Sequence, residues 1–100
     1  MDLEVVWSPE AVEDLESIAQ FIARDSAFYA GAVVERIIAT ARSLPQFPRL
    51  GRMVPEIEEE SLRERLIYNF RLIYRIREES ILVVAVIHGK QLLRAVEDRF

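Results

Sequence analysis

The fold of this chain is decided by residues 62–88, LRERLIYNFRLIYRIREESILVVAVIH. Apolar and charged side chains alternate through residues 62–67 and again through residues 71–76, which is typical of strands with one buried face. Residues 81–87 are apolar at every position, as expected of a central strand that is covered on both faces. The three segments therefore predict a small, mainly antiparallel sheet in the second half of the chain.

Helical periodicity replaces this alternation in the first half of the chain. Residues 3–7 read as a short strand, and Ser8-Pro9 then provides a helix N-cap and a proline at the first helical position. We expect a first helix over residues 9–24 and a second helix between the Asp25-Ser26 cap and Pro45. The apolar stripes of the two helices consist of Ala11, Leu15, Ile18, Ala19 and Ile22, and of Ala30, Val33, Val34, Ile37, Ala41 and Leu44.

The order of these elements predicts an α+β fold. A strand is followed by two helices and three strands (β-α-α-β-β-β), so that a two-helix hairpin can pack on one face of the sheet. Residues 45–61 contain three prolines, a glycine and four glutamates, and we expect an irregular connection there. A short C-terminal helix is expected after Gly89, with Leu92, Val96 and Phe100 on one face. Residues 1–100 are expected to form a single domain.

Composition excludes several classes of protein. The 100 residues include no cysteine, which excludes a disulfide framework, a thiolate zinc site and a cysteine nucleophile. The longest apolar run, residues 81–87, is too short to cross a bilayer, and the N-terminus carries no signal pattern. Metal-ligand spacings and glycine-rich phosphate loops are missing, so we expect neither a metal nor a cofactor. We expect a cytoplasmic protein that does not bind membranes.

Charge is distributed unevenly along the chain. The formal net charge is −4, and all bases except Lys90 are arginines. Residues 1–60 hold 5 bases and 12 acids, whereas residues 61–96 hold 7 bases and 3 acids. The acidic total argues against a general nucleic-acid coat, but it leaves room for a local anion site in the second half.

Side-chain alternation predicts which face these arginines occupy. If residues 68–70 form a three-residue hairpin loop, Ile67 lies opposite Arg71 and the two faces of the sheet are cleanly sorted. A two-residue loop would set Leu66 opposite Arg71 and bury arginines, so alternation favours the longer loop. With residues 78–79 as the next turn, the shared face is expected to carry Arg63, Arg65, Arg71, Arg75 and His88 around a floor of Ile73, Val84 and Val86.

Four arginines and a histidine on one face indicate an anionic partner. Like charges on one face repel each other, and guanidinium groups form bidentate contacts with phosphates and carboxylates. The alternative is a solvated face whose charges pair with Glu64 or with the glutamates of residues 56–60. The predicted face lacks an obvious general base, because Glu64 points to the other side of the sheet in this register.

The chain resembles the ParE/RelE toxin superfamily over nearly its whole length. Residues 7–23, WSPEAVEDLESIAQFIA, resemble the strand and first helix that open that family. A P-x-x-G-R-x-x-P-E stretch at residues 48–56 is similar to the middle of the family. Residues 62–76 and 81–90 resemble its C-terminal sheet and end in the His88-Gly89-Lys90 signature.

This resemblance implies the toxin of a bacterial type II toxin–antitoxin (plasmid stabilisation) module, which forms a hetero-oligomer with a cognate antitoxin. ParE-like toxins of the superfamily poison DNA gyrase without hydrolytic chemistry, whereas RelE-like toxins cut mRNA on the ribosome. The net charge of −4, the single lysine and the lack of any tyrosine beyond Tyr74 favour the ParE-like branch.

Two alternatives stay open at this point. As a RelE-like ribosome-dependent endoribonuclease, the chain would use Arg65 or Arg71 to stabilise the phosphate and His88 as an acid. As a toxin-fold protein that has kept only antitoxin binding, it would use the arginine face to receive acidic side chains. In either case the residues expected to bind the antitoxin or the target are Arg63, Arg65, Arg71, Arg75, His88 and Lys90.

Overall fold

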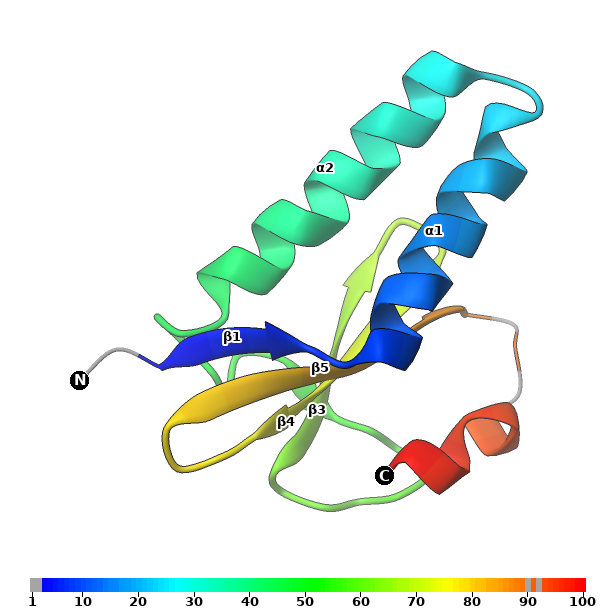
Figure 1. Cartoon of the computed structure of the whole chain (residues 1–100). Helices are drawn as coiled ribbons and strands as arrows, with labels where there is room; N and C mark the ends of the chain where they lie inside the picture. The colour runs from blue at the N-terminus through cyan, green and yellow to red at the C-terminus, as the bar shows by residue number, and fades with distance from the viewer. Residues whose placement is uncertain (1–2, 90, 92) are drawn as a thin grey trace.

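The structure is a computed structural model that describes residues 3–89, 91 and 93–100, and it confirms the α+β fold (Figure 1). A helical hairpin stands on a sheet, and the chain ends in two short 3-10 turns below it. In chain order the elements are β1 (Glu4–Trp7), α1 (Pro9–Ala23), α2 (Ala27–Ser43), β2 (Arg52–Met53), β3 (Leu62–Ile67), β4 (Phe70–Ile76), β5 (Ser80–His88), η1 (Leu93–Ala95) and η2 (Glu97–Arg99).

Local sequence signals set the ends of both helices. The Ser8 hydroxyl oxygen accepts a hydrogen bond from the Ala11 amide at 3.1 Å, and the Ser26 hydroxyl oxygen accepts one from the Tyr29 amide at 3.0 Å. Each cap satisfies an amide that has no partner inside its helix. The predicted helix starts are therefore confirmed. None of the described helices is long and apolar enough to cross a membrane.

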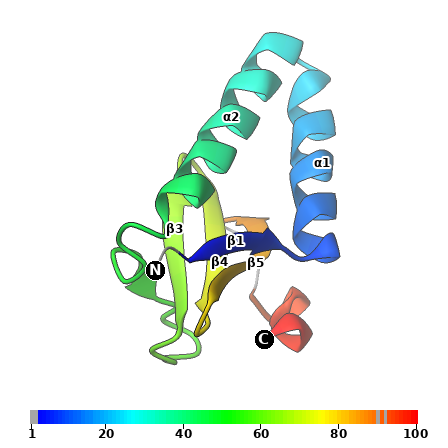
Figure 2. The same ribbon diagram turned by 60° about the vertical axis from the view of Figure 1, so that its left-hand side comes forward.

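The described strands form one sheet in the order β1-β5-β4-β3-β2. β1 runs parallel to β5, and the remaining neighbours are antiparallel. The helices cover one face, which we call the helix face, while the C-terminal turns lie on the opposite side (Figures 1 and 2). β2 lies in the connection that the sequence predicted to be irregular, where it adds a two-residue edge strand.

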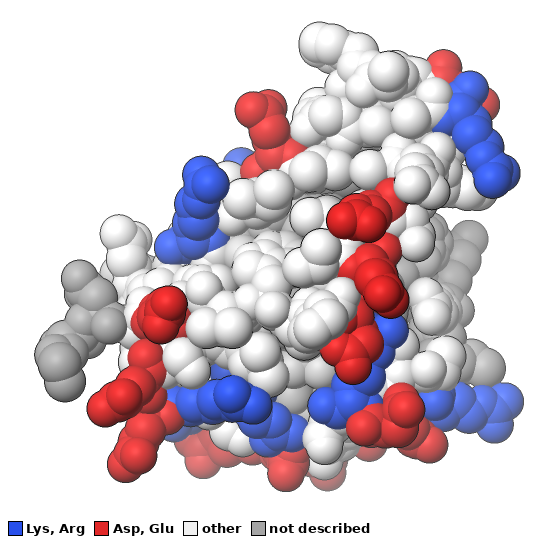
Figure 3. Space-filling view, viewed as in Figure 1, with Lys and Arg blue, Asp and Glu red and all other residues white. Residues whose placement is uncertain are grey.

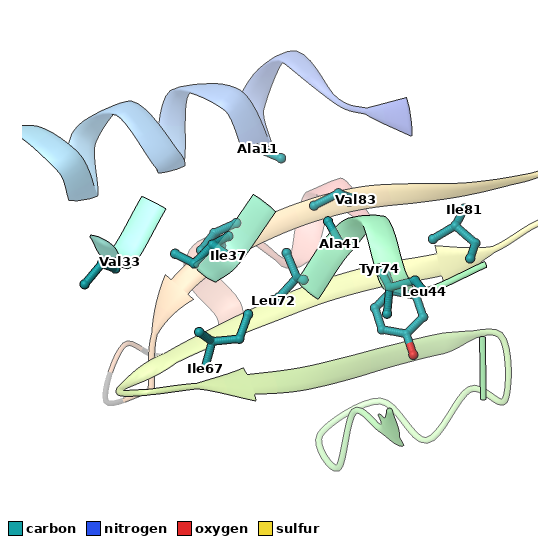
Figure 4. Packing of buried hydrophobic residues seen from close by; sticks show 11 residues of the cluster. Ala11, Val33, Ile37, Ala41, Leu44, Ile67, Leu72, Tyr74, Ile81 and Val83 are labelled. Carbon is teal, nitrogen blue, oxygen red and sulfur yellow. The ribbon is translucent and has the colours of Figure 1, made fainter. Parts of the chain in front are cut away.

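Each face of the sheet has its own hydrophobic core. On the helix face, α2 lies over β4 and β5, as the side chains of Ile37, Leu72 and Val83 show in Figure 4. The opposite core is closed by the connection and the C-terminal turns, and it consists of Val54, Leu62, Ile73, Ala85, Ile87, Leu93 and Val96. The sheet is therefore buried on both sides at its centre, as the apolar run of β5 predicts.

The register between β3 and β4 differs from the prediction by one residue. Leu66 pairs with Arg71 and Ile67 with Phe70, so the loop consists of Tyr68 and Asn69 alone. Tyr68 takes up the tight turn with a φ of 54°, a conformation that sequence rules reserve mainly for glycine, asparagine and aspartate. The predicted three-residue loop is therefore wrong.

A β-bulge between β4 and β5 changes the second predicted register. Arg75 pairs with Leu82 as predicted, but Ile73 pairs with Ala85 and Arg71 with Ile87, because β5 carries an extra residue here. Distant groups satisfy the polar backbone of the bulge. The Val84 carbonyl oxygen accepts from Ser8 and Arg99, and the Val86 amide donates to Asp14 at 3.0 Å.

The C-terminal helix is replaced by η1 and η2. Val96 and Phe100 pack against the second core, whereas Leu92 lies outside the described residues. Arg99 ties this end of the chain to α1 through an ion pair with Asp14, with 2.7 Å between Nη1 and Oδ2. This ion pair and the packing of Val96 and Phe100 together hold the short C-terminal segment against the sheet.

Replacing Gly31 with alanine is expected to raise the free energy of unfolding by about 0.5–1 kcal/mol, because glycine inside a helix loses more conformational entropy. Gly31 is exposed in α2, and a Cβ atom added there would meet nothing within 4 Å. Urea unfolding followed by circular dichroism would measure the change.

The control is Gly51→Ala. Its Cβ would lie 2.5 Å from the Tyr74 hydroxyl and 2.6 Å from the Glu64 carbonyl oxygen, so this variant should lose about 1–3 kcal/mol. Shifts of the same sign in both variants would contradict the prediction.

Candidate functional site

The predicted arginine face does not exist as one surface. In the observed register Arg63 and Arg65 lie on the helix face, while Arg71 and Arg75 lie on the opposite face. His88 pairs with Phe70 at the end of β5, and the two rings meet edge to face at 5.7 Å. The one-residue difference in the hairpin therefore divides the five predicted residues between the two sides of the sheet.

Arg71 is the centre of a buried ionic network instead. Its Nε donates to Glu64 Oε1 at 2.8 Å, and its two terminal nitrogens donate to the Glu56 carboxylate at 2.8 and 2.9 Å. Arg52, paired with Glu64 across β2 and β3, donates from Nε to Glu64 Oε2 at 2.8 Å. Glu64 is fully buried and Arg71 is 8% exposed, but the side chains of Glu56 and Arg52 are 45% and 59% exposed.

The network stabilises the charged forms of Glu56 and Arg71. The hydrogen bond from Arg71 holds the pKa of Glu56 below its ordinary value. The carboxylate of Glu56, followed by that of Glu64, raises the pKa of Arg71, against the opposing effect of burial. Two arginines and two glutamates carry no net charge together, so the network is neutral in the folded protein.

The other arginines of β3 and β4 are also engaged. Arg75 donates to Glu59 at 3.2 Å and to the Ser61 hydroxyl at 3.1 Å. Arg63 donates to three backbone carbonyls of the connection, those of Glu60, Gly51 and Arg49. The sequence offered an alternative in which the arginines pair with Glu64 or with the glutamates of residues 56–60. This alternative holds for Arg71 and Arg75.

Arg65 differs from Arg71 and Arg75. It is half-buried on the helix face, and it forms no ion pair with any residue in the described ranges. Figure 3 shows that acidic and basic side chains lie side by side along the lower edge of the molecule, and that a row of acidic side chains runs upward over α1 beside a largely uncharged central surface. The surface seen there holds mixed charge and not a basic patch.

A hollow of about 560 Å³ nevertheless brings two predicted site residues together. Arg71 and His88 both line it, at the end of the sheet next to the β3–β4 turn. Arg52, Glu56, Tyr68 and Asn69 contribute further walls. Lys90, the last predicted binding residue, lies outside the described residues. Among the described residues, His, Asp and Glu side chains form no group of three that could hold a metal ion.

The family model described as "ParE toxin of type II toxin-antitoxin system, parDE" matches residues 5–93. This chain belongs to the ParE toxin family. The match begins at Val5 within β1, includes α1, α2 and the other four strands, and ends within η1, before Arg99. No curated protein sequence matches the chain.

Solved structures share the fold of this ParE-family chain. A chromosomal ParDE toxin–antitoxin system from P. aeruginosa has a chain that superposes with a TM-score of 0.73 at 19% identity, covering 88% of this chain and 97% of its own. The YoeB dimer from Staphylococcus aureus gives a TM-score of 0.59 at 16% identity, covering 88% and 98%. The RelBE2 complex from Mycobacterium tuberculosis gives 0.59 at 24% identity, covering 88% and 99%. At these identities the likeness concerns the fold alone.

Sequence reasoning missed three members of the network in the ParE-family chain. Glu64, Glu56 and Arg52 were not predicted as site residues, and Glu64 was placed on the face away from Arg71. One signal could have found Glu64: it lies between Leu62 and Leu66, at an inward position of an alternating strand. A carboxylate at such a position needs a buried cation as partner.

A second buried polar group joins the connection to the sheet. The Tyr74 hydroxyl donates to the Pro48 carbonyl oxygen at 2.6 Å and accepts from the Gly51 amide at 3.2 Å. Figure 4 shows its oxygen at the border of the helix-face core, pointing away from the other labelled side chains. Burial raises the pKa of the Tyr74 hydroxyl above its ordinary value of 10.0.

This pKa predicts a loss of stability in alkali. Above pH 10 the Tyr74 hydroxyl of the unfolded chain gives up its proton while that of the folded chain keeps it, so the free energy of unfolding falls as the pH rises. Subtracting the ultraviolet titration curve of Tyr74→Phe from that of the unchanged chain isolates the Tyr74 hydroxyl. We expect the midpoint of this difference curve to lie above pH 10. A midpoint at or below 10, or the same alkaline loss of stability in Tyr74→Phe, would contradict the assignment.

Proposed function

We propose that this ParE-family toxin inhibits DNA gyrase without hydrolysing nucleic acid and is neutralised by a cognate antitoxin. The observation that carries the proposal is the self-neutralised state of Arg71 and Arg75, whose guanidinium groups are occupied by Glu56, Glu64 and Glu59. Of these two arginines, Arg71 is the one that the alternative RNA-cleaving site would use, and it lines the hollow together with His88.

Cleavage of RNA requires free cations and a general base, and this site is poorly suited to supply either. The reaction needs cations that stabilise charge on the phosphate and a group that removes the proton of the 2′-hydroxyl. The local network carries no net charge and the whole chain carries −4, so attraction of a polyanion is weak. Both carboxylates next to Arg71 accept hydrogen bonds from its guanidinium, and this lowers the pKa of Glu56, which makes Glu56 a weaker base.

The antitoxin is the second part of the proposal. The family is defined by a toxin–antitoxin system, and two of the similar structures are a ParDE system and a RelBE2 complex. We infer a hetero-oligomer with an antitoxin whose reading frame lies beside that of the toxin. Both gyrase and ribosomes are cytoplasmic, so the cytoplasm is the proposed location, and plasmid stabilisation is the proposed role of a plasmid-borne copy.

The deciding experiment is a gyrase assay with purified toxin that has been freed of antitoxin. We expect loss of DNA supercoiling and accumulation of cleaved DNA, and we expect added antitoxin to restore supercoiling. Unchanged gyrase activity at a large molar excess of folded toxin would reject the proposal.

A RelE-like endoribonuclease is the second candidate, since Arg71 and His88 line the same hollow. Primer extension on mRNA from cells that express the toxin distinguishes the two functions. Cuts phased with codons that disappear in His88→Gln would establish the nuclease, whereas growth arrest without such cuts fits gyrase inhibition. Antitoxin binding without either activity would identify a toxin fold that has kept only partner recognition.

A further inference from the structure

The hollow beside Arg71 already contains a carboxylate, that of Glu56. Both terminal nitrogens of Arg71 donate to it, at 2.8 and 2.9 Å, in the bidentate geometry that guanidinium groups form with free carboxylates. Glu64 Oε1 accepts from Arg71 Nε at 2.8 Å and also from Nη2 at 2.5 Å, so Nη2 is shared between the two carboxylates. The guanidinium is therefore fixed in position. Only the exposed side chain of Glu56 lies between one of its edges and the hollow.

The two carboxylates of the network differ in how they are held. Glu64 is fully buried, and its two oxygens receive hydrogen bonds from Arg71 and Arg52. Glu56 is 45% exposed and has no other ion-pair partner in the part of the chain that the structure describes. Water can solvate Glu56 once it leaves Arg71, whereas no such exchange is open to Glu64.

The backbone around Glu56 stays in place when its side chain moves. Val54 is buried, Ile57 packs against the second core, and the Glu58 amide donates to the Val54 carbonyl oxygen at 2.9 Å. Displacement of Glu56 thus needs only rotation of an exposed side chain. Without Glu56, two arginines would face Glu64 alone, and the site would carry one uncompensated positive charge.

We propose that this hollow is a carboxylate-binding site in which an acidic peptide segment of a protein partner replaces Glu56 on Arg71. The single positive charge matches one carboxylate. The walls match a peptide, because Leu66 and Tyr68, which line the hollow, are 60% and 63% exposed and offer apolar contacts to the neighbours of an acidic residue. The net charge of −4 disfavours a nucleic acid as the occupant.

The inference extends the proposed function, in which the protein partner is the antitoxin. Glu56 then acts as an internal substitute that keeps Arg71 paired while the toxin is free. Only molecules in which Glu56 has left Arg71 can bind the partner's carboxylate, so the apparent affinity is proportional to the fraction of such molecules. Removal of Glu56 should therefore strengthen binding.

The experiment is an NMR titration of ¹⁵N-labelled protein that follows the Arg71 Nε–Hε resonance. The probes are acetyl-Leu-Glu-Leu-amide, its glutamine counterpart acetyl-Leu-Gln-Leu-amide, and dimethyl phosphate. Glu56→Gln is expected to bind the glutamate peptide about tenfold more tightly than the unchanged chain, because the internal competitor is gone. The glutamine peptide should leave the Arg71 resonance unmoved.

Matched variants separate this site from a general effect of charge. Glu59→Gln makes the same change of charge on the same connection but frees Arg75, so it should bind the peptide as weakly as the unchanged chain. Arg52→Gln added to Glu56→Gln removes the uncompensated charge and should abolish the gain. The three side chains that are changed, those of Glu56, Glu59 and Arg52, are all exposed, and circular dichroism checks that each variant is folded.

Three results would overturn the inference: equal affinity of Glu56→Gln and the unchanged chain, an equal gain in Glu59→Gln, or dimethyl phosphate binding as tightly as the glutamate peptide. The last would identify a phosphodiester site. Since gyrase takes no part in the titration, a negative result leaves gyrase inhibition standing, and failure of the gyrase assay leaves the carboxylate site standing.

Discussion

Replacing Glu64 with glutamine is expected to lower the free energy of unfolding by about 3 kcal/mol, the loss typical when one partner of a buried ion pair is removed. Glu64 is fully buried and is the common partner of Arg71 and Arg52. The glutamine would leave the buried guanidinium of Arg71 with Glu56 as its remaining counter-ion. Urea unfolding followed by circular dichroism measures the change.

Two further variants control for this result. Glu56→Gln removes a half-exposed partner of the same guanidinium and should lose about 1 kcal/mol or less. Glu64→Met combined with Arg71→Met removes both buried charges, and we expect it to recover most of the stability lost in Glu64→Gln. Equal losses in Glu56→Gln and Glu64→Gln would contradict a network centred on Glu64.

The pKa of Glu56 gives this comparison a pH dependence. Because its pKa is lowered in the folded chain, the unfolded chain takes up the proton first as the pH falls. The stability due to Glu56 is therefore fully present above the ordinary pKa of 4.5 and is lost as the pH falls through the lowered value. The difference in stability between the unchanged chain and Glu56→Gln should shrink over that interval.

Leu72→Ala is expected to lower the free energy of unfolding by about 2–5 kcal/mol, whereas Leu66→Ala should change it by about 0.5 kcal/mol or less. Leu72 is fully buried on the helix face, and Leu66 is 60% exposed on the opposite side. The same chemical change on neighbouring strands therefore has two different expected outcomes. Urea unfolding under identical conditions provides the comparison.

This pair of variants also tests the register of the β3–β4 hairpin. With the three-residue loop that alternation predicts, Leu66 and Leu72 would lie opposite each other on one buried face, and both alanine variants would be strongly destabilised. In the observed register Leu72 pairs with Arg65 and Leu66 pairs with Arg71. Similar losses in the two variants would support the longer loop.

The hairpin register was mispredicted for two physical reasons. A two-residue loop needs a residue with positive φ, and tyrosine at position 68 gives no signal for one. Alternation also predicts that arginines stay out of the core, whereas Arg71 is buried. A partner from the same strand pair removes that obstacle, because Glu64 neutralises it within hydrogen-bonding distance.

The candidate site, like the hairpin, was predicted only in part. Arg71 and His88 were predicted to lie close together, and they do line one hollow. Their neighbours Glu56 and Arg52 come from the connection at residues 45–61, where prolines and glutamates give no periodic pattern. No sequence rule places such a segment against a particular strand, so its contribution to the site could not be predicted.

By itself the sequence determined the α+β class, the order of helices and main strands, and the starts of both helices. These features depend on caps, prolines and periodicity, which act between residues a few positions apart. Tertiary structure alone decided the hairpin register, the bulge at Val84 and the pairing of Arg71 with Glu56 and Glu64. Each of these depends on contacts between segments distant in the chain, such as the bond from the Val86 amide to Asp14. The local pattern of apolar and charged residues favours the register with the longer loop. The two packed cores and the buried ionic network together favour the observed register, and their total energy decides.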